Sequence, residues 1–385
     1  MIPYGRQNIE KCDIDAVIDV LNSDFLTQGP VVPSFENQVS ELTQAAYCYG
    51  VNSATSALHV ACLALRVGVG DKVWTTANSF VASANCALYC GADIDFVDIE
   101  PLSLNMSIDA LSEKLEVSER LGILPKVVIA VHFAGASVDM YALNELSKIY
   151  GFSIIEDASH AIGARYDNNQ IGSCKYSDIA VFSFHPVKII TTGEGGMLMT
   201  NNETLGSRIN LFRSHGITKA SSEFKLDKVG GWLYEQHELG FNYRMTDIQA
   251  ALGISQLERL DKFLGHRKLI ANRYERLLES FPILQQQRDI ENSSNHLFVV
   301  QLKKAECRLD IFNHMRKNGV GVNVHYIPIY HQPFYLKKGF KKSNFPNTED
   351  YYSRCLSLPI FYNMTLEEQD HVINTLILGI KELNN

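Results

Sequence analysis

The chain contains 385 residues, of which 46% are hydrophobic and 20% charged, a composition typical of a folded globular protein and not of a disordered one. This length exceeds one ordinary compact core, so we expect a large domain over residues 1–250 and a small one over residues 251–385. The formal net charge of -8 argues against nucleic acid as the main ligand, because phosphate backbones select basic surfaces.

The sequence carries no sign of export or of disulfide bonds. The sequence shows no apolar run long enough to cross a bilayer, and the residues after Met1 do not resemble a secretory signal. Its eight cysteines are scattered and form no CxxC pair. We therefore expect reduced thiols, no membrane association and a cytoplasmic location.

Helical and strand patterns alternate through the first two-thirds of the chain. Ile14, Val17, Ile18 and Leu21 mark one face of a first helix. In chain order there follow a helix at 53–65, a strand from 73, a helix at 80–89, a strand at 94–97, a helix from 107, a strand at 126–131, a helix from 139, and strands at 152–155 and 178–184. Such alternation predicts an α/β fold with a mainly parallel sheet covered by helices.

The pattern changes near residue 250. A long helical stretch runs toward residue 278, followed by a strand at 296–302 and a helix at 309–317. A loop rich in proline and tyrosine occupies 326–335, and a last helix begins near 365. These elements predict a smaller α/β domain at the C-terminal end.

Lys188 stands four residues after the apolar run 178–184 and is followed by the glycine cluster 193–196. A strand of this kind is buried on both faces of a parallel sheet, and a cation beside such a core is costly unless it is paired or neutralised. Condensation of the amine with an aldehyde neutralises it, as in lysines that carry pyridoxal phosphate. An exposed loop position is the alternative interpretation for any single lysine.

Two further features fit the same chemistry, although each has an ordinary alternative. Asp157 follows the predicted strand at 152–155, on the sheet edge where open α/β sheets bind ligands, yet an acid there also fits a helix cap. The small residues at 52–56 precede a helix whose first N–H groups could bind phosphate, or they could form a plain N-cap. Ser183 places a hydroxyl in an apolar strand, where it needs a partner.

Other ligand classes lack their signatures. No GxxxxGK[ST] segment is present, and Gly68 and Gly70 lack the third glycine of a dinucleotide fingerprint, which excludes the usual ATP and NAD sites. His325 and His331 have no HExxH motif or carboxylate partner, so we expect no metal.

Taken together, these residues resemble the DegT/DnrJ/EryC1/StrS family of sugar-nucleotide aminotransferases, which have the fold-type-I architecture of pyridoxal-phosphate enzymes. The resemblance covers essentially the whole chain. Its markers occur in order at 26–29, 52–56, 78–85, 156–160, 183–188, 193–196, 213–216 and 240–245.

The resemblance implies roles for individual residues around pyridoxal phosphate. Lys188 matches the lysine that binds the cofactor covalently, and Asp157 matches the acid that pairs with the pyridinium nitrogen. Phe80 lies where an aromatic ring stacks on the cofactor, and His160 matches a position near its 3-hydroxyl.

The resemblance also implies a site for the cofactor phosphate to which two chains contribute. The backbone at Ala54 and Thr55 and the hydroxyl of Ser183 match its local part. Asn242 matches a residue that reaches the phosphate from the neighbouring subunit, which implies a homodimer with shared active sites.

Within the family, the segments 24–29, 293–297 and 324–330 are similar to the branch that aminates C4 of a UDP-linked 4-keto sugar for pseudaminic acid, with L-glutamate as donor. In that branch the sugar-nucleotide pocket is lined by residues that match Tyr4, Asp24, Phe25, Leu26, Thr27, Ala54, Ser183, Asn242, His325, Tyr326, Ile327 and Pro328.

Three alternatives to this substrate assignment differ in kind. A related transaminase could act on another UDP- or dTDP-linked keto sugar, because a few loop contacts set sugar preference. A non-catalytic relative would have lost Lys188, Asp157 or Ser183, and all three are present. The third alternative is a family member that dehydrates the sugar. Such members carry histidine at the position of Lys188, so Lys188 argues against that branch.

Overall fold

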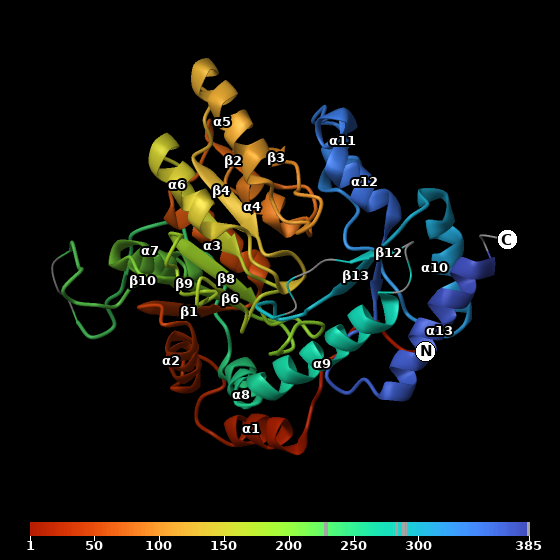
Figure 1. The fold of residues 1–385 in the computed structure, drawn as a ribbon. Helices are drawn as coiled ribbons and strands as arrows, with labels where there is room; N and C mark the ends of the chain where they lie inside the picture. Colours follow the sequence, from red (N-terminus) through yellow and green to blue (C-terminus); the bar gives the residue numbers. More distant parts are fainter. Residues whose placement is uncertain (227–229, 280, 282–283, 287–288, 290, 383–385) are drawn as a thin grey trace.

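The structure, a computed structural model, describes residues 1–382 except 227–229, 280, 282–283, 287–288 and 290 (Figure 1). Within these residues, no helix combines the length and apolar character needed to cross a membrane.

A seven-stranded sheet forms the centre of the larger part of the molecule, in the order β1-β9-β8-β5-β4-β2-β3. Its strands in that order are Tyr47–Val51, Gly196–Thr200, Ile179–Ser183, Ser153–Asp157, Val127–Val131, Lys72–Thr76 and Asp93–Val97. The neighbouring strands from β8 to β3 pair in parallel, whereas β9 runs antiparallel to both β1 and β8. The predicted α/β fold with a mainly parallel sheet is confirmed, and β9 is its one reversed strand.

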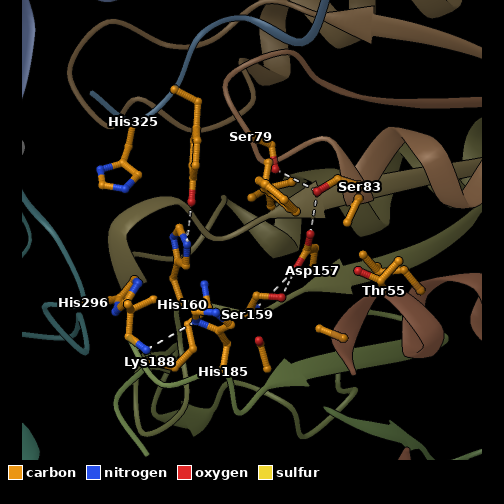
Figure 2. Close-up of a pocket in the computed structure, with 18 of the residues that line it drawn as sticks. Thr55, Ser79, Ser83, Asp157, Ser159, His160, His185, Lys188, His296 and His325 are labelled. Atoms are coloured by element: carbon orange, nitrogen blue, oxygen red, sulfur yellow. Dashed lines mark hydrogen bonds between the residues drawn. The ribbon is translucent and has the colours of Figure 1, made fainter. Parts of the chain in front are cut away.

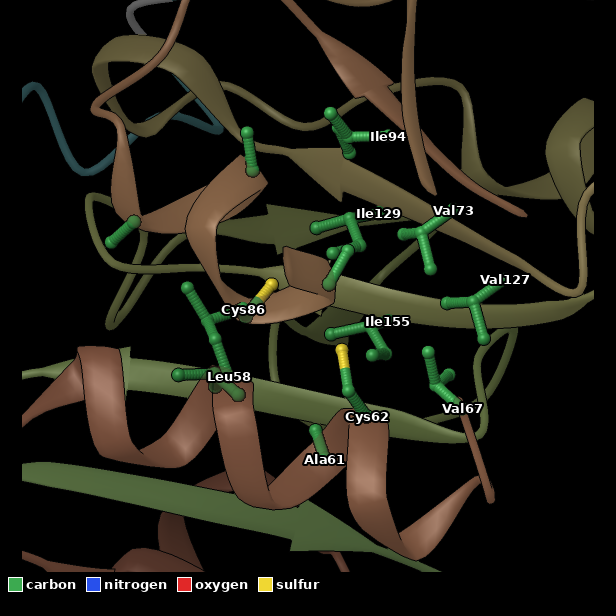
Figure 3. Close-up of a cluster of buried hydrophobic side chains, with 14 of the residues drawn as sticks. Leu58, Ala61, Cys62, Val67, Val73, Cys86, Ile94, Val127, Ile129 and Ile155 are labelled. Atoms are coloured by element: carbon green, nitrogen blue, oxygen red, sulfur yellow. The ribbon is translucent and has the colours of Figure 1, made fainter. Parts of the chain in front are cut away.

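Successive residues of each strand point to opposite faces of this sheet, and each face has its own helices. Ile155 of β5 packs in the cluster formed by α3 (Ala54–Ala64) and α4 (Ala82–Tyr89), which Figure 3 shows around Cys62 and Cys86. Its neighbour Ile154 faces α5 (Ile108–Leu121) and α6 (Met140–Tyr150). The near-continuous apolar runs of these strands therefore reflect burial on both sides.

The reversed end of the sheet is covered by four further helices. These are α2 (Val31–Thr43), α7 (Glu203–Arg213), α8 (Asp247–Leu257) and the first part of α9 (Leu260–Leu278). The long helical stretch expected before residue 278 is thus two helices, with a break at Glu258 and Arg259. Arg259 forms ion pairs with Asp13 and Glu10 beside α1 (Lys11–Leu21), and these contacts hold the break against the N-terminal helix.

The predicted first helix is present, but its apolar face is not covered within the chain. Ile14, Ile18 and Leu21 of α1 are 52%, 45% and 54% exposed. The opposite face of α1 packs on α8 and buries Val20 and Asp13. This apolar stripe is available to another molecule.

A three-stranded antiparallel sheet forms the smaller C-terminal part, as predicted for an α/β unit there. Its strands are β12 (Leu284–Gln286), β13 (Phe298–Leu302) and β14 (Cys355–Leu358), and α10 (Arg308–Lys317) and α13 (Leu366–Glu382) pack against it. Helix α9 contributes Phe263 to the core of the larger part and Tyr274 to this one. The domain boundary near residue 250 remains a prediction.

The first residues of the chain are tied into the C-terminal part. Ile2 pairs with Val320 in a parallel bridge, and its carbonyl accepts the Gly321 N–H at 2.7 Å. The Tyr4 carbonyl accepts the Ile360 N–H at 3.1 Å. These bonds place the Tyr4 side chain at the edge of the large sheet, where it lines the cavity described next.

Candidate active site

A cavity of about 530 Å³ lies at the carboxyl ends of β5 and β8, where the large and small parts of the molecule meet (Figure 2). Open α/β sheets place their ligands at this edge. Ten of the residues predicted from the sequence line it: Tyr4, Ala54, Thr55, Phe80, Asp157, His160, Ser183, Lys188, His325 and Tyr326.

Lys188 enters this cavity from the turn that follows β8. The turn returns the chain to β9, and it is fixed by bonds of Phe184 to Gly195 and Thr192, while the Lys188 N–H donates to the His185 carbonyl at 2.8 Å. Desolvation lowers the pKa of the Lys188 amine to about 8, and the charge of Asp157 partly opposes that shift. A large fraction of the amine is therefore neutral and nucleophilic near pH 8.

Asp157 is buried at the end of β5 and is held by hydroxyl groups. Ser83 of α4 donates to its Oδ2 at 2.6 Å, and Ser159 donates to its Oδ1 from its hydroxyl at 2.6 Å and from its amide at 3.3 Å. Ser79 lies 2.7 Å from the Ser83 hydroxyl. These hydrogen bonds orient the carboxylate, and no basic side chain of the described residues is bonded to it.

At another part of the cavity wall, the first residues of α3 lie close to the first residue of β9. Ser53 caps the helix by accepting the Ser56 N–H at 3.1 Å, so the first amides of the helix, at Ala54 and Thr55, precede the intrahelical ladder. Gly196 faces them, and a Cβ at Gly196 would lie 2.7 Å from the Ala54 nitrogen. Ser183 is the register partner of Gly196. The arrangement is a cradle for an anion such as phosphate.

Histidines form the wall opposite this cradle. His160 is buried, and its Nδ1 accepts the Ala134 N–H at 3.2 Å while its Nε2 lies 3.0 Å from the Tyr326 hydroxyl. The His296 ring packs against His160 with a centroid separation of 4.4 Å. Desolvation, reinforced by Lys188 and His325, lowers the pKa of His160 well below its ordinary value, so the imidazole is neutral.

His325 contributes a second neutral imidazole at the mouth of the cavity. Its Nδ1 lies 2.8 Å from the Ser357 hydroxyl, and its ring is 5.4 Å from that of Tyr4. Desolvation, followed by the charge of Lys188, lowers the pKa of His325 to about 3. Near Lys188, His160 and His325 are therefore hydrogen-bonding groups without a positive charge.

Seven predicted residues do not line the cavity of their own chain. These residues are Asp24, Phe25, Leu26, Thr27, Asn242, Ile327 and Pro328. The segment 24–27 is exposed and joins the start of α8, where the Asp247 N–H donates to the Leu26 carbonyl at 3.0 Å. Asn242 is also exposed and lies beside Asn52, which immediately precedes the cap of α3.

Several cavity residues were missed by the sequence reasoning. Ser83 and Ser159 bind Asp157 directly, and His296 packs on His160. A signal was present for each: Ser83 lies in the marker segment 78–85, Ser159 in 156–160 and His296 in 293–297. Motifs identified these segments, but only the fold shows which of their side chains face the cavity.

Pyridoxal phosphate fits these residues. Its aldehyde requires an amine of reduced pKa, its pyridine nitrogen a carboxyl group, and its phosphate a cradle of backbone N–H groups, and the cavity has one of each. Phe80 is 59% exposed at the cavity, so a planar ring can cover it.

Comparisons with known proteins agree with this chemistry. A model of the DegT/DnrJ/EryC1/StrS aminotransferase family matches residues 7–377. A Campylobacter jejuni protein (subsp. jejuni serotype O:2) named UDP-4-amino-4,6-dideoxy-N-acetyl-beta-L-altrosamine transaminase is 39% identical over 382 residues, which cover 98% of this chain and 96% of that protein.

Solved structures give the same result. Helicobacter pylori PseC, described as an aminotransferase involved in the biosynthesis of pseudoaminic acid, has a TM-score of 0.90 at 32% identity and covers 99% of both chains. NtdA from Bacillus subtilis, solved with bound cofactor PMP, has a TM-score of 0.83 at 30% identity and covers 97% of this chain and 83% of its own.

Proposed function

The chain belongs to the DegT/DnrJ/EryC1/StrS aminotransferase family, and we propose that it transfers the amino group of L-glutamate to C4 of a UDP-linked 4-keto-6-deoxy-N-acetylhexosamine. The protein is a transaminase of fold type I that depends on pyridoxal phosphate, as the sequence predicts. The proposed product is UDP-4-amino-4,6-dideoxy-N-acetyl-β-L-altrosamine, an intermediate on the route to pseudaminic acid.

One observation carries the choice of substrate. The similarity to the transaminase named for this product extends over 98% of the chain at 39% identity. The PseC structure, whose description also refers to this pathway, matches over 99% of the chain. Tyr4, His325 and Tyr326, which belong to the predicted sugar-nucleotide pocket, line the same cavity as Lys188 and support the proposal.

When bound, pyridoxal phosphate supplies an aldehyde that condenses with amines and a pyridine ring that accepts the electron pair left when a proton is removed from carbon. Asp157, oriented by Ser83 and Ser159, would pair with the pyridine nitrogen and keep it protonated. The Lys188 Nζ removes the α-proton of the donor amino acid, and in the second half-reaction it delivers a proton to C4 of the sugar. Its lowered pKa lets it accept and release that proton near neutrality.

We further propose a homodimer in which each cavity receives Asn242 from the other subunit. In support, Asn242 is exposed and lies outside the cavity of its own chain. The exposed stripe of Ile14, Ile18 and Leu21, with the adjacent Phe25 and Leu26, is an apolar surface suited to a second copy. The proposed location is the cytoplasm, supported by eight cysteines that are all free.

Turnover of purified substrates tests the sugar and the donor together. The enzyme is incubated with L-glutamate and UDP-4-keto-6-deoxy-N-acetylhexosamines of both C5 configurations, and the aminated carbon is assigned by NMR. We expect amination at C4 of the L-configured sugar and release of 2-oxoglutarate. Equal or faster turnover of a dTDP-linked keto sugar would replace this proposal with the related transaminase considered above.

A further inference from the structure

The hydrogen bonds of His160 determine which of its nitrogens carries the proton. The Ala134 N–H can only donate, so the Nδ1 atom that it contacts at 3.2 Å must be an unprotonated acceptor. A neutral imidazole then carries its proton on Nε2. The 3.0 Å contact with Tyr326 is consequently a bond in which His160 Nε2–H donates to the tyrosine oxygen.

The surrounding backbone fixes this arrangement from both sides. Ala134 has a left-handed conformation with φ 57° and ψ 4°, which an alanine adopts only under the constraint of its neighbours. Its carbonyl accepts the His296 N–H at 2.9 Å. Ser294 donates from its amide to the Gly135 carbonyl at 3.2 Å and from its hydroxyl to the His160 carbonyl at 2.5 Å. The segment 293–297, noted in the sequence without a role, therefore clamps the turn 133–135 onto His160.

Tyr326 is left with a hydroxyl proton to donate. Its oxygen accepts from His160, and within the described part of the chain the hydroxyl makes no other hydrogen bond. Its amide is fixed separately by the Asn78 side chain at 3.3 Å. The titratable groups that face the His160–Tyr326 pair are Lys188, Asp157, His296, His325 and Tyr4. The hydroxyl proton is therefore available to a ligand in the cavity.

The substitution pattern of the pyridine ring of pyridoxal phosphate indicates which of its atoms accepts a hydrogen bond from the Tyr326 hydroxyl. The nitrogen of the ring belongs at Asp157, the aldehyde carbon at Lys188 and the phosphate at the Ala54–Gly196 cradle. The phenolic oxygen is on the opposite side of the aldehyde carbon from the phosphate, and thus on the histidine side. Both nitrogens of His160 already have protein partners.

From this geometry we propose that the Tyr326 hydroxyl donates the hydrogen bond to the phenolic oxygen of pyridoxal phosphate, and that His160 is a positioning residue that acts through Tyr326. A donor at that oxygen stabilises the form in which it bears a full negative charge. The pair thereby lowers the pH at which the lysine-bound cofactor loses its proton.

The test is a pH titration of the visible absorbance of the bound cofactor, which needs no turnover. We expect Tyr326→Phe to raise the midpoint by about one to two pH units, because it removes one hydrogen bond to a charged oxygen. His160→Leu should raise the midpoint as well, and should add nothing in the Tyr326→Phe background. His160→Gln, whose amide can accept from Ala134 and donate to Tyr326, should restore a midpoint close to that of the wild type.

Tyr351→Phe is the matched control, because the buried Tyr351 hydroxyl donates to the His325 carbonyl at 2.6 Å and does not line the cavity. It should lower the melting temperature and leave the midpoint unchanged. A midpoint that moves in His160→Leu but not in Tyr326→Phe would show that His160 touches the oxygen itself and would overturn the proposal. A wild-type protein without any visible band would overturn both this inference and the proposed function.

Discussion

At the scale of single residues, the chemistry depends on an amine whose pKa is lowered by its surroundings. The Lys188 pKa of about 8 results from desolvation, opposed by Asp157. Only the neutral amine attacks an aldehyde, so the rate of cofactor binding by the apoenzyme should rise with pH and level off above about 8. Stopped-flow absorbance across pH measures this profile. A rate that keeps rising toward the ordinary lysine value would contradict the assigned environment.

Asp157 and its neighbour Glu156 offer a paired test, because consecutive carboxylates of one strand face opposite sides of the sheet. Asp157→Asn should still bind the cofactor covalently but slow each half-reaction about a hundredfold or more, because a neutral amide does not hold the pyridine nitrogen protonated. Single-turnover absorbance with glutamate measures the loss.

Glu156 contacts His132 and Ser177 on the far face of the same strand. Glu156→Gln should therefore lower the melting temperature and leave the half-reaction close to the wild-type rate. Equal loss of rate in both variants would mean that Asp157 acts only through the stability of β5.

At the scale of elements, the sequence predicted which helices and strands exist better than it predicted the direction of each strand in the sheet. The alternating pattern identified β2, β3, β4, β5 and β8 and most helices, because burial on both faces leaves a strong apolar signal. The sequence reasoning did not identify β1 or β9. The apolar run 196–200 also gives no sign that β9 is reversed, because an apolar strand has the same pattern in either direction. The order of the motifs likewise did not show that segment 24–27 lies outside the cavity of its own chain, whereas Asn242 was expected to come from the neighbouring subunit.

Replacement of two helical glycines by alanine should change the free energy of unfolding in opposite directions. Gly253 of α8 faces the buried Phe35, and a Cβ there would lie 2.7 Å from its Cζ, so Gly253→Ala should destabilise by about 1–3 kcal/mol. Gly265 of α9 is exposed with no atom within 4 Å of its Cβ position, so Gly265→Ala should stabilise by about 1 kcal/mol. Denaturant unfolding measures both. A change of the same sign in the free energy of unfolding of both variants would contradict the packing of α8 on α2.

At the scale of the whole molecule, the proposed homodimer with shared active sites predicts that two inactive variants can complement each other. Lys188→Ala and Asn242→Asp should each inactivate the homodimer, the second by placing a carboxylate near the phosphate. A heterodimer of the two variants, isolated with two different tags, should recover about half of the wild-type activity, because one of its two sites has both native residues.

The control for this experiment combines Lys188→Ala with Asp157→Asn. Both residues line the cavity of a single chain, so no site in that heterodimer is intact. No recovery is expected there. Recovery in the control, or none in the first heterodimer, would remove the support for a site completed by Asn242 of the second subunit.

The attachment of the chain's beginning to Val320, Gly321 and Ile360 has a practical consequence for anyone who prepares this enzyme. Because Tyr4 forms part of the cavity wall, trimming residues 1–4 would open the reaction chamber to water as well as remove a side chain. Affinity tags and fusion partners therefore belong after residue 385, and a loss of catalysis caused by a bulky leader sequence should be reversed when that leader is cleaved.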